Sequence, residues 1–130
     1  MQDLIIEATK SSPRIQLNPV THVLDIRGES YPENATKFYA PVFAWLGRYL
    51  AELGDEPVTV NLCISYFNSS SSKALMNLFD QLEDACRAGR RISVFWYYDP
   101  DNETALECGE EFREDARELQ FQLVALPAQP

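Results

Sequence analysis

One stretch, residues 58–88, constrains the fold more than any other part of the chain. In residues 58–66 the large apolar side chains fall at every second position, which is the period of a β-strand. After a serine-rich run the apolar side chains recur at spacings of three and four, which predicts an amphipathic helix packed on the sheet. This apolar stripe consists of Leu75, Leu78, Phe79, Leu82 and Cys86. The sequence therefore predicts a central strand that passes directly into a long helix.

Four consecutive serines, Ser69 to Ser72, lie where the predicted strand passes into the predicted helix. The start of a helix has backbone N–H groups without partners and carries partial positive charge, so it favours an anion. In one interpretation a serine caps the helix and the other serines fill the turn. In the other, one serine accepts a phosphate, and the helix start tolerates the added negative charge. Composition alone does not choose between them.

The charge balance and the cysteines limit the classes of protein to which this chain can belong. The 130 residues carry a formal net charge of −9, so we expect no nucleic acid and no anionic membrane as partner, because both select basic surfaces. Basic protein partners fit better. Three scattered cysteines, Cys63, Cys86 and Cys108, predict reduced thiols in a cytoplasmic protein. We expect neither a signal peptide nor a membrane-spanning segment.

Strands and helices alternate along the chain. Further strands are expected at residues 4–8, 14–17, 21–27, 92–98 and 121–124, and further helices at about 34–53 and 102–118. Residues 14–27 read as a hairpin around Asn18 and Pro19. Asn34 is suited to cap the helix that follows it, and Pro41 either delays the start of that helix or kinks it.

This order of elements predicts an α/β fold, a single domain over residues 1–126 with a mixed β-sheet, followed by a disordered tail at residues 127–130. One face of the central strand is polar, which is unusual for a strand covered on both sides. We therefore expect the helices mainly on one face of the sheet. The residues of this polar face are Thr59, Asn61, Cys63 and Ser65.

The sequence offers little chemistry for catalysis. A histidine-activated serine would need His22, the one histidine, which we place in an early strand. The cysteines are too scattered for a zinc site, and the serine run lacks the glycines of a phosphate-binding loop. We expect a binding or regulatory domain without metal or cofactor, and not an enzyme. The many carboxylates at residues 107–118 form either a solvated helix face or a docking strip for a basic partner.

Three motifs, in this order, carry a resemblance. They are Gly-Glu-Ser-Tyr-Pro-Glu-Asn at residues 28–34, Tyr-Phe-Asn-Ser-Ser-Ser-Ser-Lys-Ala-Leu-Met at residues 66–76, and Trp-Tyr-Tyr-Asp at residues 96–99. With them the chain resembles the SiaC family of bacterial regulatory phosphoproteins. The resemblance implies a fold similar to the STAS domain of anti-sigma-factor antagonists, with a phosphoacceptor at the start of the helix after the central strand.

The resemblance also implies a partner-switching role. A serine/threonine kinase of the histidine-kinase-like ATPase type would phosphorylate the protein, and a PP2C-like phosphatase would reverse this. The unphosphorylated form would bind and activate a diguanylate cyclase, and so control cyclic-di-GMP and biofilm formation. The alternative is a constitutive interaction domain, or one of the anti-sigma-antagonist type, that acts on another target.

By position, the resemblance makes Ser69 the acceptor, because it follows the asparagine after the strand. The family pattern has threonine there, whereas this chain has four serines, so Ser70 and Ser71 are rivals. Lys73, one helical turn further on, is placed to pair with a phosphate. The predicted partner-binding residues are Tyr66, Phe67, Asn68, Ser70, Ser71, Ser72, Lys73, Tyr31, Asn34 and Tyr98.

Overall fold

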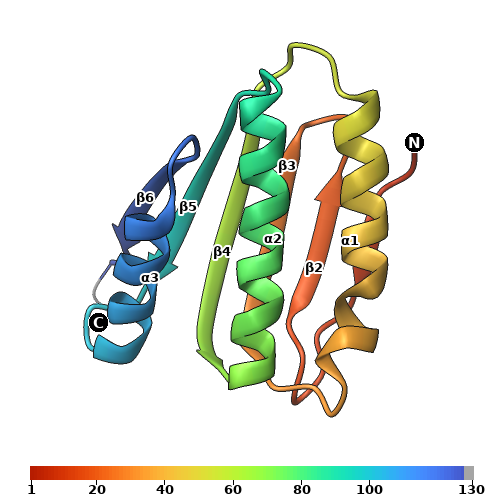
Figure 1. Cartoon of the computed structure of the whole chain (residues 1–130). Coiled ribbons are helices and arrows are strands. Elements are labelled where there is room, and N and C mark those ends of the chain that lie inside the picture. Colours follow the sequence, from red (N-terminus) through yellow and green to blue (C-terminus); the bar gives the residue numbers. More distant parts are fainter. Residues whose placement is uncertain (128–130) are drawn as a thin grey trace.

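The strands lie across one sheet in the order in which they occur along the chain (Figure 1). The computed structural model describes residues 1–127, which form six strands and three helices; the tail expected at residues 127–130 falls largely outside this range. The strands are β1 (Leu4–Ile6), β2 (Arg14–Asn18), β3 (Val23–Ser30), β4 (Val58–Phe67), β5 (Ile92–Tyr98) and β6 (Gln120–Ala125). The helices are α1 (Ala35–Glu52), α2 (Ser69–Arg87) and α3 (Glu103–Asp115).

The sheet is mixed. Strands β1, β2 and β3 pair antiparallel, whereas β3, β4, β5 and β6 run parallel to one another. The helices of the described chain cover one face of the sheet, and α1 and α2 lie side by side over its centre (Figure 1). The predicted α/β fold, its mixed sheet and the placement of helices on one face are confirmed.

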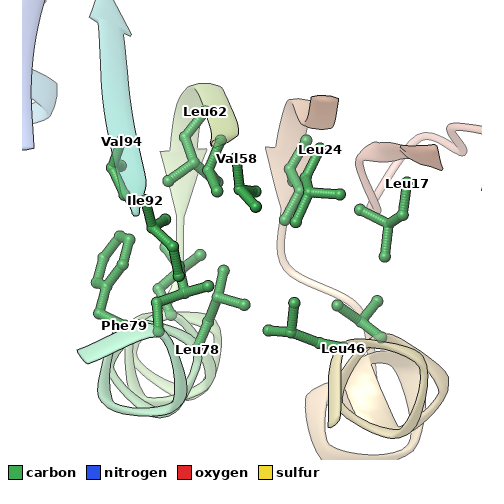
Figure 2. Packing of buried hydrophobic residues seen from close by; sticks show 14 of the residues in the cluster. Leu17, Leu24, Leu46, Val58, Leu62, Leu78, Phe79, Ile92 and Val94 are labelled. Carbon is green, nitrogen blue, oxygen red and sulfur yellow. The ribbon is translucent and has the colours of Figure 1, made fainter. Parts of the chain in front are cut away.

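The core lies between the sheet and the helices. Along β4 the side chains alternate between buried positions facing the helices, such as Leu62, and half-exposed positions on the other face, such as Asn61. Figure 2 shows Leu46 of α1 and Leu78 of α2 pointing from the helices toward the strands. Each fully buried leucine stabilises the fold by about 1.5–3 kcal/mol. The period change seen in the sequence is therefore the change from strand to helix.

The predicted hairpin is the β2–β3 pair, and its turn is held by a side chain. The Oδ1 atom of Asn18 accepts hydrogen bonds from the backbone N–H groups of Val20, at 2.9 Å, and Thr21, at 3.1 Å. His22 has a φ of 61° and belongs to this turn, so β3 begins at Val23. The expectation that His22 lies in a strand is wrong. Its left-handed backbone conformation is not that of a strand, and the extended chain of β3 starts only at the next residue.

Helix α1 begins immediately after its cap. The Oδ1 atom of Asn34 accepts a hydrogen bond from the N–H of Lys37 at 3.0 Å, as the sequence predicted. Pro41 lies inside the helix and does not delay its start. The cap supplies an acceptor for one of the N–H groups that the first turn leaves free, which stabilises a helix by about 1 kcal/mol.

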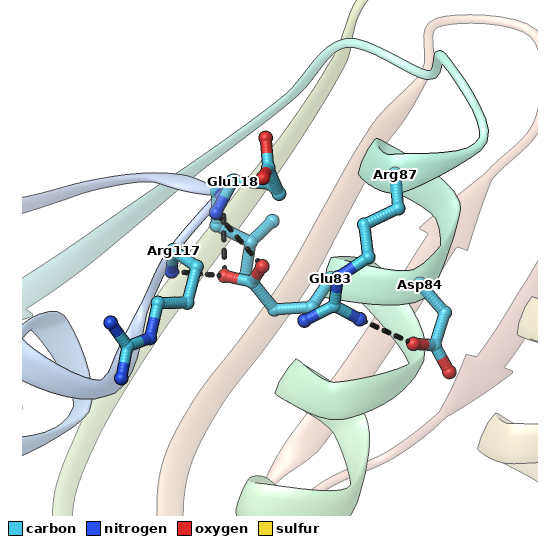
Figure 3. Close-up of polar contacts among 6 residues, drawn as sticks. Glu83, Asp84, Arg87, Arg117 and Glu118 are labelled. Atoms are coloured by element: carbon cyan, nitrogen blue, oxygen red, sulfur yellow. Dashed lines mark hydrogen bonds and ion pairs between the residues drawn. The ribbon is translucent and has the colours of Figure 1, made fainter.

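A buried carboxylate ends α3 earlier than expected. Glu83 of α2 is 7% exposed, and its oxygens accept hydrogen bonds from the backbone N–H groups of Arg117 at 2.8 Å, Glu118 at 2.9 Å and Leu119 at 3.2 Å. Figure 3 shows Glu83 reaching from α2 to this segment. These N–H groups turn toward Glu83, so the helix stops at Asp115 instead of continuing to residue 118.

The environment of Glu83 lowers the pKa of its carboxyl group. Burial by itself raises this pKa, but the donated backbone hydrogen bonds and the nearby charge of Arg87 lower it further than burial raises it. Glu83 is therefore ionised at neutral pH and links α2 to the segment between α3 and β6.

Candidate functional site

The loops after β3, β4 and β5 meet at one edge of the sheet, which we call the carboxyl edge (Figure 1). Parallel strands end at the same side, so α1, α2 and α3 all begin there. The turn before α3 is tied to β4, because the Nδ2 atom of Asn102 donates a hydrogen bond to the backbone oxygen of Ser65 at 2.8 Å. This edge carries the predicted acceptor and the predicted partner-binding residues.

Asn68, and not a serine, caps α2. Its Oδ1 atom accepts hydrogen bonds from the backbone N–H of Ser71 at 2.9 Å and from the hydroxyl of Ser70 at 3.1 Å. The interpretation in which a serine caps this helix is therefore wrong. Because the cap is supplied by Asn68, the hydroxyl of Ser69 at the first helical position has no capping role.

The four serines have different environments. Ser71 is 0% exposed, and its Oγ accepts a hydrogen bond from the Oγ of Ser30 at 2.8 Å. The same Ser30 oxygen lies 2.6 Å from the hydroxyl of Tyr39, so a buried chain of hydroxyls joins α2, β3 and α1. Ser69 and Ser70 are exposed, and Ser72 is half-buried. The structure thus presents two hydroxyls to solvent and seals a third.

The sealed chain of hydroxyls is neutral. Burial raises the pKa of Tyr39, and the hydrogen bond from Ser30 lowers it by a smaller amount. The phenol is therefore protonated at neutral pH and takes part in the chain as a hydroxyl. Sequence reasoning did not single out Ser30 or Tyr39. The signal for Ser30 was available, because it continues the inward-facing positions Leu24 and Ile26 of β3.

The start of α2 is suited to an anion. Its first turn consists of Ser69 to Ser72, so it carries no carboxylate to offset the partial positive charge of the helix terminus, whereas the first turn of α3 contains Glu103. Lys73 is exposed and lies four residues after Ser69, on the same face of the helix. A phosphate on Ser69 would meet both of these positive contributions.

Aromatic residues flank the turn on its exposed side. Tyr66 is 54% exposed, and its ring packs edge-on against that of Tyr31, with the ring centroids 5.7 Å apart. Phe67 points the other way, and its ring packs against Trp96 at 6.0 Å. Tyr66 and Tyr31 therefore contribute to the surface around Ser69, while Phe67 contributes mainly to the core.

The remaining predicted partner-binding residues lie at the same edge with structural roles. The side-chain oxygen of Asn34 is used in capping α1, although the residue is exposed. Tyr98 ends β5, pairs with Ala125 of β6 and packs against the hydrophobic core. The exposed residues around the acceptor are thus mainly Tyr66, Ser69, Ser70 and Lys73, and the half-buried Tyr31 packs against Tyr66.

His22 lies at the opposite end of β4 from the serines. The N–H of Thr59, at the start of β4, donates to the backbone oxygen of His22, and the Nδ1 atom of His22 lies 2.6 Å from the hydroxyl of Tyr49. Burial, with a smaller contribution from the charge of Glu56, raises the pKa of Tyr49 to about 12. A strand as long as β4 spans about 33 Å. His22 therefore does not activate the serines for nucleophilic catalysis.

Comparison with known proteins agrees with this geometry. The model of the SiaC family of regulatory phosphoproteins matches residues 6–126. This chain belongs to the SiaC family. An uncharacterised protein of Pseudomonas aeruginosa strain UCBPP-PA14 is 44% identical over 115 residues, which are 88% of this chain and 90% of that protein.

Solved SiaC structures share the fold. Apo-SiaC from Pseudomonas aeruginosa is 39% identical with a TM-score of 0.86, and the match covers 98% of this chain and 100% of that one. SiaC in complex with the diguanylate cyclase SiaD, which it activates, is 41% identical with a TM-score of 0.90, over 95% and 100% of the two chains.

Within residues 1–127, no helix combines the length and the apolar character needed to cross a membrane.

Proposed function

We propose that this SiaC-family chain is a partner-switching regulator that performs no catalysis itself. The unphosphorylated form binds and activates a diguanylate cyclase in the cytoplasm, and so controls cyclic-di-GMP and biofilm formation. Phosphorylation of Ser69 by a kinase of the histidine-kinase-like ATPase type ends this interaction, and a PP2C-like phosphatase restores it. The similarity to SiaC in complex with the cyclase SiaD supports the choice of partner.

The observation that carries this proposal is the exposed hydroxyl of Ser69 beside the sealed hydroxyl of Ser71. A kinase needs access to the oxygen that it modifies, and Ser69 and Ser70 offer it whereas Ser71 is fully buried. Ser70 remains the rival, although its hydroxyl is already bonded to Asn68 at 3.1 Å. Ser69 is free of that bond and occupies the first helical position.

The switch would act through local charge. A phosphate adds nearly two negative charges at neutral pH. At Ser69 it would lie on the surface that includes the exposed Tyr66 and the half-buried Tyr31, and these rings offer aromatic contact area to a partner in the unmodified state. A partner surface that packs closely on this patch cannot accommodate the charge without desolvating it. The sheet and its core stay unchanged, because the added group is on the outside.

The test uses the SiaD-like diguanylate cyclase of the same organism. Its affinity for wild type, Ser69→Ala and Ser69→Asp is measured, together with the rate at which it makes cyclic-di-GMP in the presence of each. We expect Ser69→Ala to bind like wild type and Ser69→Asp to bind at least about tenfold more weakly, a difference of about 1.4 kcal/mol. Thr21→Asp is the matched control, because it adds the same charge to an exposed hydroxyl residue in the β2–β3 turn, at the opposite end of the sheet, and should bind like wild type. Ser70→Asp tests the rival acceptor and should weaken binding less than Ser69→Asp does. Equal affinities of all three Ser69 forms would contradict the switch and favour a constitutive interaction domain.

A further inference from the structure

A small apolar groove lies between α2 and α3, and on α2 it begins at Met76, about two helical turns after Ser69. The rings of Phe79 and Phe112 pack edge-on with their centroids 5.0 Å apart, and Phe121 of β6 packs against Phe79 at 5.4 Å. The groove holds about 60 Å³, which is room for one apolar side chain and too little for a metabolite. Besides these rings, Met76, Asp80, Glu83 and Asp115 line it.

The rim of the groove combines an apolar side chain with negative charge. Met76 is 51% exposed, and a flexible methionine on a surface adapts readily to an inserted side chain. Asp80 and Asp115 are exposed, and within the described chain neither takes part in an ion pair. The carboxylate of Glu83 is already bonded to the backbone. Two carboxylates are thus left without a counter-charge beside an apolar cavity.

We propose that this groove, which we call the α2–α3 groove, is a second docking point for the diguanylate cyclase. It takes one bulky apolar side chain of the cyclase, flanked by an arginine or lysine that pairs with Asp80 or Asp115. This inference rests on the proposed function and adds a chemical description of the partner segment. It also gives Asp115, an α3 carboxylate that lines the groove, a role in docking.

A second copy of this chain is a poorer occupant. Each chain has a net charge of −9, so two copies repel one another, and an acidic rim adds to that repulsion. A basic segment of another protein is instead attracted by the negative charge of this chain.

The test compares the double variant Asp80→Lys/Asp115→Lys with the matched control Glu110→Lys/Glu114→Lys, which changes two exposed carboxylates of α3 outside the groove. Affinity for the cyclase is measured by calorimetry at low and high salt. We expect the groove variant to bind at least about tenfold more weakly and to lose most of the salt dependence, and the control to stay within about twofold of wild type. Met76→Gln tests the apolar part, with an expected loss of about fivefold.

The outcomes separate this inference from the proposed function. If the groove variants bind like wild type while Ser69→Asp still weakens binding, the groove inference is wrong and the switch stands. If the wild type does not bind the cyclase at all, both fail. If the groove variant changes the oligomeric state in light scattering and leaves cyclase binding intact, the occupant is a second copy and our assignment is wrong.

Discussion

The two ends of α2 handle charge in opposite ways. At the first turn, Asn68 provides a neutral cap, exposed serines follow it, and the adjacent buried contacts are a chain of hydroxyls. Toward the last turns, the carboxylate of Glu83 is buried and held by backbone N–H groups. Near the end of α2, backbone N–H groups of the protein itself stabilise the buried charge of Glu83. At the start of α2 the first turn carries no charged side chain, so a negative charge added there meets no like charge. Under the proposed function, this difference would let a phosphate on Ser69 alter the surface without disturbing the core.

The largest effect should come from placing a charge on the wrong serine. Ser71→Asp puts a carboxylate into a fully buried position beside Ser30, so we expect a loss of about 3–5 kcal/mol in the free energy of unfolding. Urea denaturation followed by circular dichroism measures this loss. If Ser71→Asp is as stable as Ser69→Asp, the distinction between the sealed and the exposed serine is not real.

Removing the buried carboxylate should have the next largest effect. Glu83→Ala leaves the N–H groups of Arg117, Glu118 and Leu119 without their acceptor, and we expect a loss of about 3 kcal/mol in the free energy of unfolding. The control is Asp84→Ala, which removes an exposed carboxylate paired with Arg87 and should cost less than about 1 kcal/mol. Similar losses in both variants would mean that the backbone contacts of Glu83 contribute little.

The same carboxylate predicts a dependence of stability on pH. The pKa of Glu83 is lower in the folded state than its ordinary value of 4.5, so its contribution is fully present above that value. It is lost as the pH falls from about 4.5 through the folded-state pKa. As the pH falls through this acid range, the melting temperature of wild type should therefore decrease more steeply than that of Glu83→Gln. Parallel pH profiles of the two proteins would show that Glu83 is not responsible.

The smallest expected effect lies at the exposed end. Ser69→Asp places a negative charge on the free terminus of α2, so it should raise the free energy of unfolding by about 0.5 kcal/mol at low salt. The gain should shrink in a Lys73→Ala background, since Lys73 lies on the same face. Denaturant titrations of the single and double variants measure both. A destabilising Ser69→Asp would mean that this end does not tolerate charge.

The sequence predicted the elements whose evidence is local. The change of period between β4 and α2 lies within one stretch of chain, and so does the cap of α1 by Asn34. The burial of Ser71 could also have been predicted from the sequence. Ser71 continues the stripe of Leu75, Leu78 and Leu82 one turn toward the helix start, so its burial follows from the spacing.

Long-range contacts were beyond what the sequence predicts. The end of α3 depends on Glu83, which lies 34 residues before Arg117, the first backbone donor. The α2–α3 groove depends on aromatic rings from α2, α3 and β6, and their meeting follows from how the helices pack. The place of His22 was missed because a left-handed turn residue that is not glycine is rare.

The most direct test is to phosphorylate the protein with its kinase, map the phosphate by mass spectrometry and measure the melting temperature of the modified form. We expect a single phosphate on Ser69, and a melting temperature equal to or slightly above that of the unmodified protein. A phosphate on Ser71, or a modified protein that melts well below the unmodified one, would contradict the proposed switch.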